Sequence, residues 1–398
     1  MIKRIHKFVI FVCLFLAVSS AAEAYSLIDW FYDKNPPMIS TGFDNTKTYK
    51  GEISIHFLVA DRETAVDKIS IFLDDKDITS SADFKARYFK NRIDLDTRKL
   101  LDGTHNMTIM ASDKARDRNL VKMKISFTVD NTPPTLRFVR NSRLYYGKTT
   151  VLYFRGSEPD LDIKGSFQGK EVECYPTDGR DYALTLGSEL SDPPDKGYIL
   201  RLSAKDKAGN FTNREVYVKV YPSRYPVVRF RLRPRKAHLL SPEIIRADWD
   251  RAQEILIGKR PEKFLVGRFI LPAKGVISLP FGTLEYINGK MRGRHRGIDI
   301  ANVKGTQIKA SNSGEVVLAE YLPAHGNTVI IDHGRGIFSF YAHLHEFKTE
   351  VGQRVWKGQV IGTMGSTGIS TAPHVHFSVS VHDTRVDPVQ WVNSTMVE

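Results

Sequence analysis

Histidines are the residues of this chain best suited to chemistry, and they are unevenly placed. Eight of the twelve lie from residue 295 onward: His295, His325, His333, His343, His345, His374, His376 and His382. Imidazole binds zinc and transfers protons near neutral pH. The only cysteines are Cys13 and Cys174, which excludes a disulfide scaffold and a cysteine-based zinc cage. The composition therefore favours chemistry carried by histidine.

Two short motifs combine residue types that suit a metal ion. In GRHRGID, three residues that include Gly297 separate His295 from Asp299, and together the pair offers nitrogen and oxygen ligands for zinc. In PHVHF the alternation of residue types predicts a strand, with His374 and His376 on one face. One of these imidazoles can bind a metal while the other acts on its water. The alternative is a surface strand with two solvated histidines and an accidental H-x-x-x-D pair.

The elements that must position these groups are β-strands. GEVVLAEYL, NTVIIDH and HVHFSVSVH alternate with a period of two, which predicts an all-β unit. A third imidazole, His343, ends another alternating run at YAHL. The other four histidines of this region are interpreted as turn or surface residues: His325, His333, His345 and His382.

The motifs and their order resemble a known family. GRHRGIDIA, HGNTVIIDHG with FYAHL, VGQRVWKGQVIGTMGSTG and PHVHF follow one another within residues 268–392. This segment is similar to the lysostaphin/LytM-type zinc metallopeptidases, the peptidoglycan endopeptidases of bacterial cell walls. One departure is that Phe281-Gly282 is followed by Thr283-Leu284-Glu285, where many relatives have arginines. That departure concerns substrate contacts at one end of the groove.

The resemblance implies one Zn²⁺ ion held by His295, Asp299 and His376, with His343 and His374 as the catalytic pair. Three protein ligands leave a fourth position for water, as in catalytic zinc sites. Zinc lowers the pKa of that water to about 7, near neutral pH. Neutral His374 would accept the water's proton and return it to the leaving amine, and His343 would donate to the oxyanion.

The N-terminal half of the chain is expected to form two β-sandwiches. EISIHFLVAD, KISIFLDD, HNMTIMASD and KMKISFTVD are alternating runs bounded by turn residues. GTHNMTIMASDKA at 103–115 resembles GYILRLSAKDKA at 197–208, which indicates a weak internal repeat. Residues 25–132 and 133–222 therefore resemble tandem immunoglobulin-like modules of bacterial surface proteins.

Residues 223–264 are expected to form a basic linker and one helix. Ser241 suits the N-cap and Pro242 the first helical position, and apolar residues recur at helical spacing as far as Leu256. The basic run 224–236 is interpreted as a solvated strand or linker face. The fold class is thus mostly β: two tandem immunoglobulin-like β-sandwiches, a short helical linker, and a C-terminal all-β LytM-type peptidase domain over residues 265–398.

Residues 1–24 have the pattern of a signal peptide. Lys3, Arg4 and Lys7 precede an apolar run at 8–18, and an A-x-A cleavage site ends at Ala24. The run is short for a membrane span, so we expect an exported, periplasmic or envelope-associated protein without a stable span after cleavage. An uncleaved anchor stays open.

The formal net charge of +13 favours a polyanionic partner. Nucleic acid, an anionic membrane and an anionic cell wall are the candidates, and export makes nucleic acid the least suitable. Charge alone does not choose between the other two; the family resemblance implies peptidoglycan.

These observations predict an exported zinc-dependent endopeptidase that hydrolyses peptide cross-links of peptidoglycan. Two alternatives remain. One is a catalytically inactive LytM-like protein that binds the wall or activates an amidase, and the other is an adhesin or scaffold. The N-terminal modules are expected either to cover the groove of the enzyme or to tether it to the wall or to a regulatory protein partner.

Overall fold

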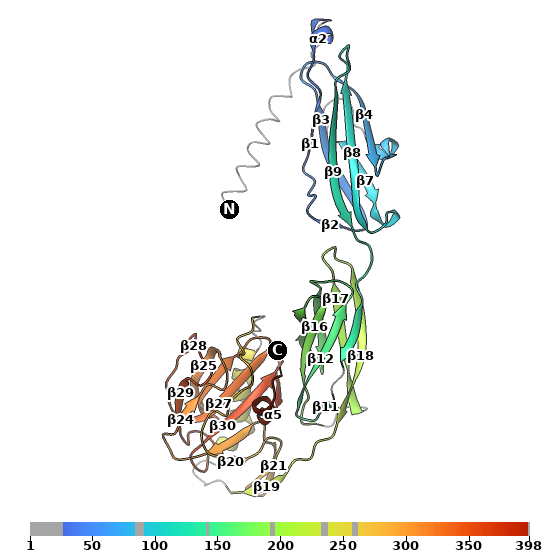
Figure 1. Cartoon of the computed structure of the whole chain (residues 1–398). Helices are drawn as coiled ribbons and strands as arrows, with labels where there is room; N and C mark the ends of the chain where they lie inside the picture. Colours follow the sequence, from blue (N-terminus) through green and yellow to red (C-terminus); the bar gives the residue numbers. More distant parts are fainter. Residues whose placement is uncertain are drawn as a thin grey trace. The chain divides into compact units, whose positions relative to one another are not determined.

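The computed structural model describes residues 27–83, 91–140, 143–191, 196–231, 238–256 and 262–396. The predicted signal peptide lies outside these ranges. The chain divides into two compact units, residues up to 132 with 207–210, and residues 133–206 with the chain from 211 onward. Both are built mainly from strands (Figure 1), as predicted. A search of the described ranges for a helix long and apolar enough to cross a membrane finds none.

The first unit is a sandwich of two sheets that share one hydrophobic core. The core contains Ile55 and Ile93 from one sheet and Ile71, Met107 and Phe127 from the other. The strand orders are β1-β3-β7-β6 and β2-β9-β8-β4-β5. The bounds are β1 Met38–Thr41, β2 Thr48–Tyr49, β3 Glu52–Ala60, β4 Val66–Leu73, β5 Lys76–Asp77, β6 Ala82–Asp83, β7 Asn91–Asp96, β8 Gly103–Asp113 and β9 Leu120–Val129. A short helix, α2 (Leu27–Tyr32), precedes them.

The second sandwich repeats this topology. Its sheets have the orders β10-β12-β16-β15 and β11-β18-β17-β13-β14. The bounds are β10 Leu136–Arg140, β11 Leu144–Tyr145, β12 Thr149–Gly156, β13 Asp162–Phe167, β14 Lys170–Glu173, β15 Tyr175–Asp178, β16 Asp181–Gly187, β17 Gly197–Lys205 and β18 Phe211–Tyr221. The two repeat copies form β8 and β17, which occupy the same place in their sheets, so the internal repeat is confirmed. Assignment of either sandwich to the immunoglobulin-like class stays a prediction.

The C-terminal part contains a ten-stranded sheet with the main order β20-β23-β30-β27-β26-β25-β28. The bounds are β20 Val276–Leu279, β23 Ile298–Ala301, β24 Gln307–Lys309, β25 Gly314–Leu322, β26 Gly326–Asp332, β27 Ile337–Phe347, β28 Arg354–Val355, β29 Val360–Met364, β30 His374–Val381 and β31 Thr384–Val386. Val375, Phe377 and Val379 of β30 are completely buried in the main core. The alternation of the strand therefore puts His374 and His376 on the opposite face.

The segment predicted as a linker packs onto this sheet. Helix α4 (Pro242–Leu256) begins as expected, since Ile244 N–H donates to Ser241 Oγ at 3.2 Å. Its buried Ala252 and Leu256 share an apolar cluster with residues of strands β25, β26 and β27, namely Leu318, Ile330, Phe338 and Phe340. Upstream of the helix, β19 (Val227–Phe230) pairs with β21 (Leu284–Ile287), and β21 pairs with β22 (Lys290–Arg294).

The basic run is exposed where the structure describes it. Arg224, Arg229 and Arg231 all face solvent, which agrees with a solvated strand. The rest of the run, residues 232–236, lies outside the described ranges.

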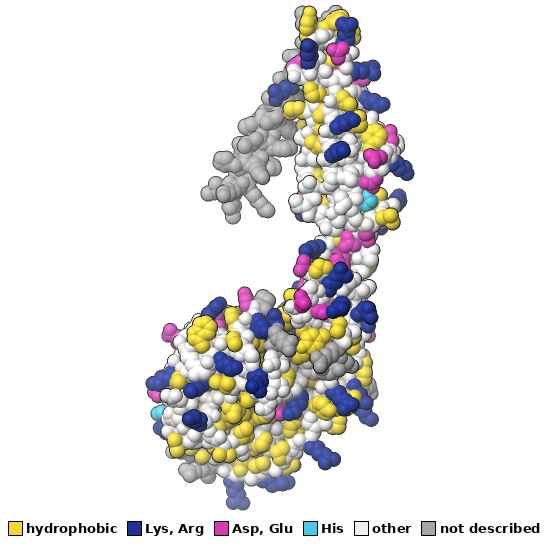
Figure 2. Space-filling view, in the orientation of Figure 1, with side chains coloured by type: hydrophobic (Ala, Val, Ile, Leu, Met, Phe, Trp, Pro, Cys, Tyr) yellow, Lys and Arg dark blue, Asp and Glu magenta, His cyan; other side chains and the backbone are white. Residues whose placement is uncertain are grey.

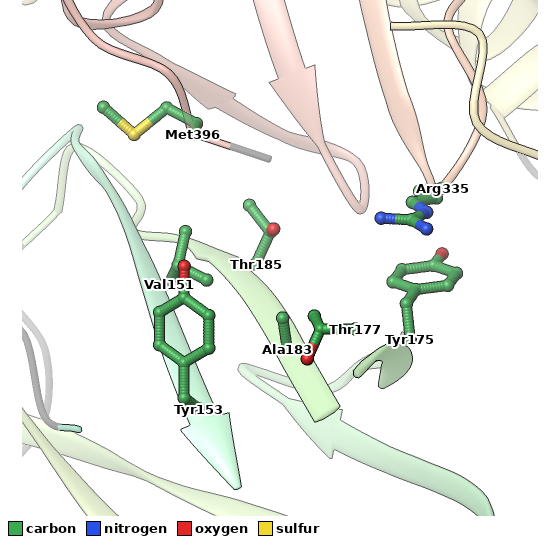
Figure 3. Close-up of a pocket in the computed structure, with 8 residues that line it drawn as sticks. All are labelled: Val151, Tyr153, Tyr175, Thr177, Ala183, Thr185, Arg335 and Met396. Carbon is green, nitrogen blue, oxygen red and sulfur yellow. The ribbon is translucent and has the colours of Figure 1, made fainter. Parts of the chain in front are cut away.

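Within the second unit, the second sandwich contacts the end of the C-terminal part. Trp391 of α5 (Pro388–Asn393) donates from Nε1 to Thr149 Oγ1 at 3.0 Å. Nearby, the guanidinium of Arg335 lies 4.7 Å from the ring centroid of Tyr175 (Figure 3). The cavity there holds about 10 Å³, room for one water molecule at most. This cavity is therefore too small to be a ligand site.

Candidate metal centre and catalytic groups

Three ligand-type atoms converge at one point on the C-terminal sheet. Asp299 of β23 and His376 of β30 stand directly opposite each other in the antiparallel register, and His376 Nδ1 lies 2.9 Å from Asp299 Oδ1. His295, just after β22, brings Nε2 to 2.9 Å from His376 Nδ1 and 3.1 Å from Asp299 Oδ1. The predicted H-x-x-x-D and H-x-H motifs are thus brought together.

This donor set fits a zinc ion. Two imidazoles and one carboxylate are ligands that zinc prefers, at about 2.0–2.2 Å each, and the three atoms are close enough to share one ion. His295 Nδ1 lies 3.2 Å from the carbonyl oxygen of Pro280. That contact holds Nε2 towards the other two donors, as second hydrogen bonds commonly orient metal-binding histidines.

Burial and charge act in opposite directions on these groups. Burial raises the pKa of Asp299, but the hydrogen bonds and charges of His295 and His376 hold that pKa well below its usual range. Burial lowers the pKa of His376 to about 4. Burial also lowers the pKa of His295, but the hydrogen bond with Asp299 and the negative charges of Asp299 and Glu285 together outweigh it, and the net shift is upward. The centre therefore offers an ionised carboxylate and a neutral His376 imidazole, the states that bind metal.

Gly297 is required where the chain passes beneath His376. A Cβ at this position would lie 2.6 Å from His376 Nε2 and 2.6 Å from the carbonyl oxygen of Phe377. Neither contact is tolerable, since atoms of the close-packed strand cannot move away without shifting the imidazole.

We therefore expect Gly297→Ala to displace His376 and lower zinc affinity by roughly tenfold or more. Competition with a chromophoric chelator measures the affinity directly. Gly42→Ala is the matched control, because a Cβ there meets nothing within 4 Å and metal binding should not change. Unchanged zinc affinity in Gly297→Ala would show that the close approach does not position His376.

The two remaining predicted residues stand beside the three donors. His374 Nε2 lies 3.7 Å from Asp299 Oδ2, while its Nδ1 lies 2.9 Å from the carbonyl oxygen of Ala372. His343 Nδ1 lies 2.8 Å from the carbonyl oxygen of Thr367. The ring centroids of His343 and His374 are 4.7 Å apart. In both rings Nδ1 donates its proton to a carbonyl oxygen, so in the neutral ring Nε2 is the nitrogen that can accept a proton.

His343 has an unusual backbone conformation. Its φ is +63°, in the left-handed region that costs energy for a residue with a side chain. Its N–H donates to the carbonyl oxygen of His325 at 2.8 Å, and the ring is buried. Burial lowers the pKa of His343 well below its usual value, and the charges of His374 and His376 lower it further. The backbone of His343 is thus held in a strained conformation, and its imidazole is kept neutral beside the three donor atoms.

The four histidines that were interpreted as turn or surface residues agree with that prediction only in part. His325 lies in a turn and His345 is exposed, as expected. His333, however, is completely buried, with its ring nitrogens 2.7 Å from Ser313 O and from Ser339 Oγ. His382 lies in a turn but is also buried. Because two polar partners satisfy both ring nitrogens of His333, its burial costs little.

Sequence reasoning missed Asp248 of α4. This buried carboxylate accepts hydrogen bonds from the N–H groups of Ala324 and His325, at 2.8 and 3.0 Å. It also lies 2.8 Å from His325 Nδ1. Helix α4 therefore holds the turn whose carbonyl binds the His343 backbone.

A cavity of about 300 Å³ opens beside the metal centre; we call it the groove cavity. Helix α4 lines one side with Asp248 and Trp249, and the sheet supplies Phe340 and His376. Arg385, also not predicted, completes this wall. The cavity is large enough for a few residues of a peptide, since ligand sites begin at about 300 Å³.

Comparison with known proteins finds a match for this region. Residues 293–388 match the model described as Peptidase family M23. The DD-carboxypeptidase/endopeptidase Mpg of Neisseria meningitidis is 39% identical over 113 residues, 28% of this chain and 26% of that protein. The peptidoglycan DD-endopeptidase ShyA of Vibrio cholerae is 38% identical over 96 residues, 24% and 22% of the two chains.

A third relative is named for a different role. The murein hydrolase activator EnvC of Escherichia coli is 31% identical over 126 residues, 32% of this chain and 29% of that protein. The chain thus spans less than a third of the length of each of these relatives.

Proposed function

Because residues 293–388 form a LytM-type peptidase domain of family M23, we propose that the protein is an exported, zinc-dependent endopeptidase that hydrolyses peptide cross-links of peptidoglycan. The observation that carries the proposal is the complete set of five groups. Three donor atoms converge within hydrogen-bonding distance of one another, and two further imidazoles stand beside them. A site retained only for binding has no need of all five.

In the proposed reaction, His295, Asp299 and His376 hold the ion, and His374 handles the proton. When bound, zinc activates a water molecule and polarises the carbonyl oxygen of the scissile bond. The Nδ1–H of His374 faces the carbonyl oxygen of Ala372, so its Nε2 is free to accept a proton from water. The same nitrogen then returns that proton to the leaving amine.

The structure limits how His343 takes part. Its Nδ1–H faces the carbonyl oxygen of Thr367, so the neutral ring can only accept at Nε2. Donation to an oxyanion therefore requires that His343 first take up a proton. Because burial keeps the resting ring neutral, that proton would have to come from solvent as negative charge develops on the oxyanion, and the protonated ring would then donate to it.

Two observations support peptidoglycan as the substrate. Two of the relatives are named as DD-endopeptidases or peptidoglycan endopeptidases, and the chain is strongly basic. Lys and Arg side chains are spread over the visible face rather than gathered in one patch (Figure 2). Dispersed positive charge suits a broad anionic polymer such as the cell wall.

The main alternative is a catalytically inactive protein that activates an amidase, and the activator relative favours it. The complete donor set favours hydrolysis. In either case we propose export by residues 1–24 and a role of the two sandwiches in targeting or restraint.

The test is digestion of purified peptidoglycan sacculi by the full chain without residues 1–24. We expect soluble muropeptides cut within their cross-links, activity loss after chelation, and recovery on adding zinc. Chromatography with mass spectrometry identifies the bond that is cut. Intact sacculi at full zinc occupancy, with stimulation of an added amidase, would establish the activator instead.

A further inference from the structure

We propose that Arg385 and Arg296 form a subsite that binds a carboxylate of the peptide substrate in the groove cavity. The inference rests on the proposed function and specifies which substrates the site prefers. It begins from two guanidinium groups that line the groove cavity beside the same aromatic ring. Their charges have no acidic partner within ion-pairing distance among the residues that the structure describes.

The sheet places Arg385 on the same face as the metal centre. Arg385 of β31 stands opposite Ser380 of β30, and Ser380 shares its face with His376 because the two are four residues apart on one strand. The guanidinium carbon lies 3.2 Å from the ring centroid of Phe340. Phe340 pairs with Ser378, two residues from His376. Two strand positions span roughly 7 Å, about two residues of an extended substrate.

The two arginines share the ring of Trp249 from helix α4. The guanidinium carbons of Arg296 and Arg385 each lie 5.2 Å from its centroid. Arg385 is thus held between Trp249 and Phe340, and two aromatic faces fix its planar group. Such a fixed guanidinium fork can bind both oxygens of a carboxylate with little loss of conformational freedom.

The charge of Arg385 is buried and has no direct ion-pair partner among the described residues. The residue is only 9% exposed, and its Nη1 has no hydrogen-bond partner among the described residues. Burial lowers its pKa to about 9; Asp383 opposes this shift, and the positive charge of Arg296 adds to it. A buried cation without a counter-charge is costly. An anion between the two guanidinium groups would remove that cost.

The nearby acids form no ion pair with the two arginines among the described residues. Asp383 accepts a hydrogen bond from Gln253 Nε2 at 2.8 Å and lies 3.9 Å from Lys170 Nζ. Asp248 binds the turn at His325 through Oδ2, and its Oδ1 is buried without a hydrogen-bond partner among the described residues. Neither carboxylate neutralises the arginine pair directly. The missing partner is therefore expected to arrive with the ligand, and a peptide in this groove supplies it as a free carboxylate.

Binding of cross-linked muropeptides to the zinc-free full chain tests the proposal without turnover. Calorimetry compares the untreated peptides with peptides whose carboxylates have been converted to amides. We expect the untreated form to bind roughly tenfold more tightly or better, as for charge-assisted hydrogen bonds. Arg385→Gln should abolish this preference and leave binding of the amidated form within about twofold. Equal binding of both forms by the unchanged protein would overturn the subsite.

Two further variants separate recognition from a structural role. Arg296→Gln alters an exposed side chain, so the fold should persist while the carboxylate preference falls severalfold. Arg292→Gln is the matched control: Arg292 lines the same cavity, but its Nη1 donates to Leu240 O, and the preference should stay unchanged. If Arg385→Gln weakens both peptide forms equally, Arg385 merely clamps α4 and the proposal is wrong. Hydrolysis is scored separately, so loss of the endopeptidase function would not mimic either result.

Discussion

A His376→Ala variant is expected to purify without zinc and to leave sacculi undigested. The three donor atoms form a nearly equilateral triangle with sides of 2.9, 2.9 and 3.1 Å, so removal of the imidazole takes away one of its three corners. Two remaining ligands are too few to hold the ion in the geometry that hydrolysis requires. His295→Ala and Asp299→Ala should behave in the same way. Elemental analysis of the purified variants gives the zinc content, and release of muropeptides gives the activity.

His345→Ala is the appropriate control, because His345 lies in the same sheet but is exposed. It should keep one zinc ion per chain and full activity. Full zinc occupancy in any of the three ligand variants would remove that residue from the ligand set.

His374→Ala and His343→Ala are expected to keep zinc and yet lose turnover. Neither ring supplies one of the three converging atoms, and each is held by its own carbonyl contact. Loss of a general base lowers the rate by roughly two to four orders of magnitude. Single-turnover digestion of a defined muropeptide, at measured zinc occupancy, separates this effect from loss of the metal.

The two histidines of the H-x-H motif make the assignment testable in both directions. If His374→Ala loses the ion while His376→Ala keeps it, the two roles are reversed. If both variants keep zinc and activity, neither histidine is required for metal binding or hydrolysis.

Local features of the site could be predicted from sequence because they depend on neighbouring residues. Strand alternation put His374 and His376 on one face, and Ser241-Pro242 marked the start of α4. The meeting of His295 with His376 is a different matter, since 81 positions separate them. Only the pairing of β23 with β30 brings them together, so that assignment came from family resemblance rather than from spacing.

The features that sequence reasoning missed all depend on distant partners. Asp248 and His325 are 77 positions apart, and a carboxylate on a helix is ordinarily solvated. Arg385 was not singled out because a strand arginine near the chain end is usually exposed, whereas Trp249 and Phe340 cover it here. His333 gave no signal of burial, because the two oxygens that satisfy it lie on other segments.

The docking of α4 bears on how a shortened protein would behave in solution. Phe338, Phe340 and Ile330 are buried by a helix that precedes the recognised peptidase segment. Cutting the chain after Leu256 would uncover this strip of the sheet to water. Apolar strips of that kind drive self-association, so the trimmed peptidase should precipitate or stick to its own copies. Poor solubility of such a fragment would then result from the loss of helix α4, and it would give no information about catalysis.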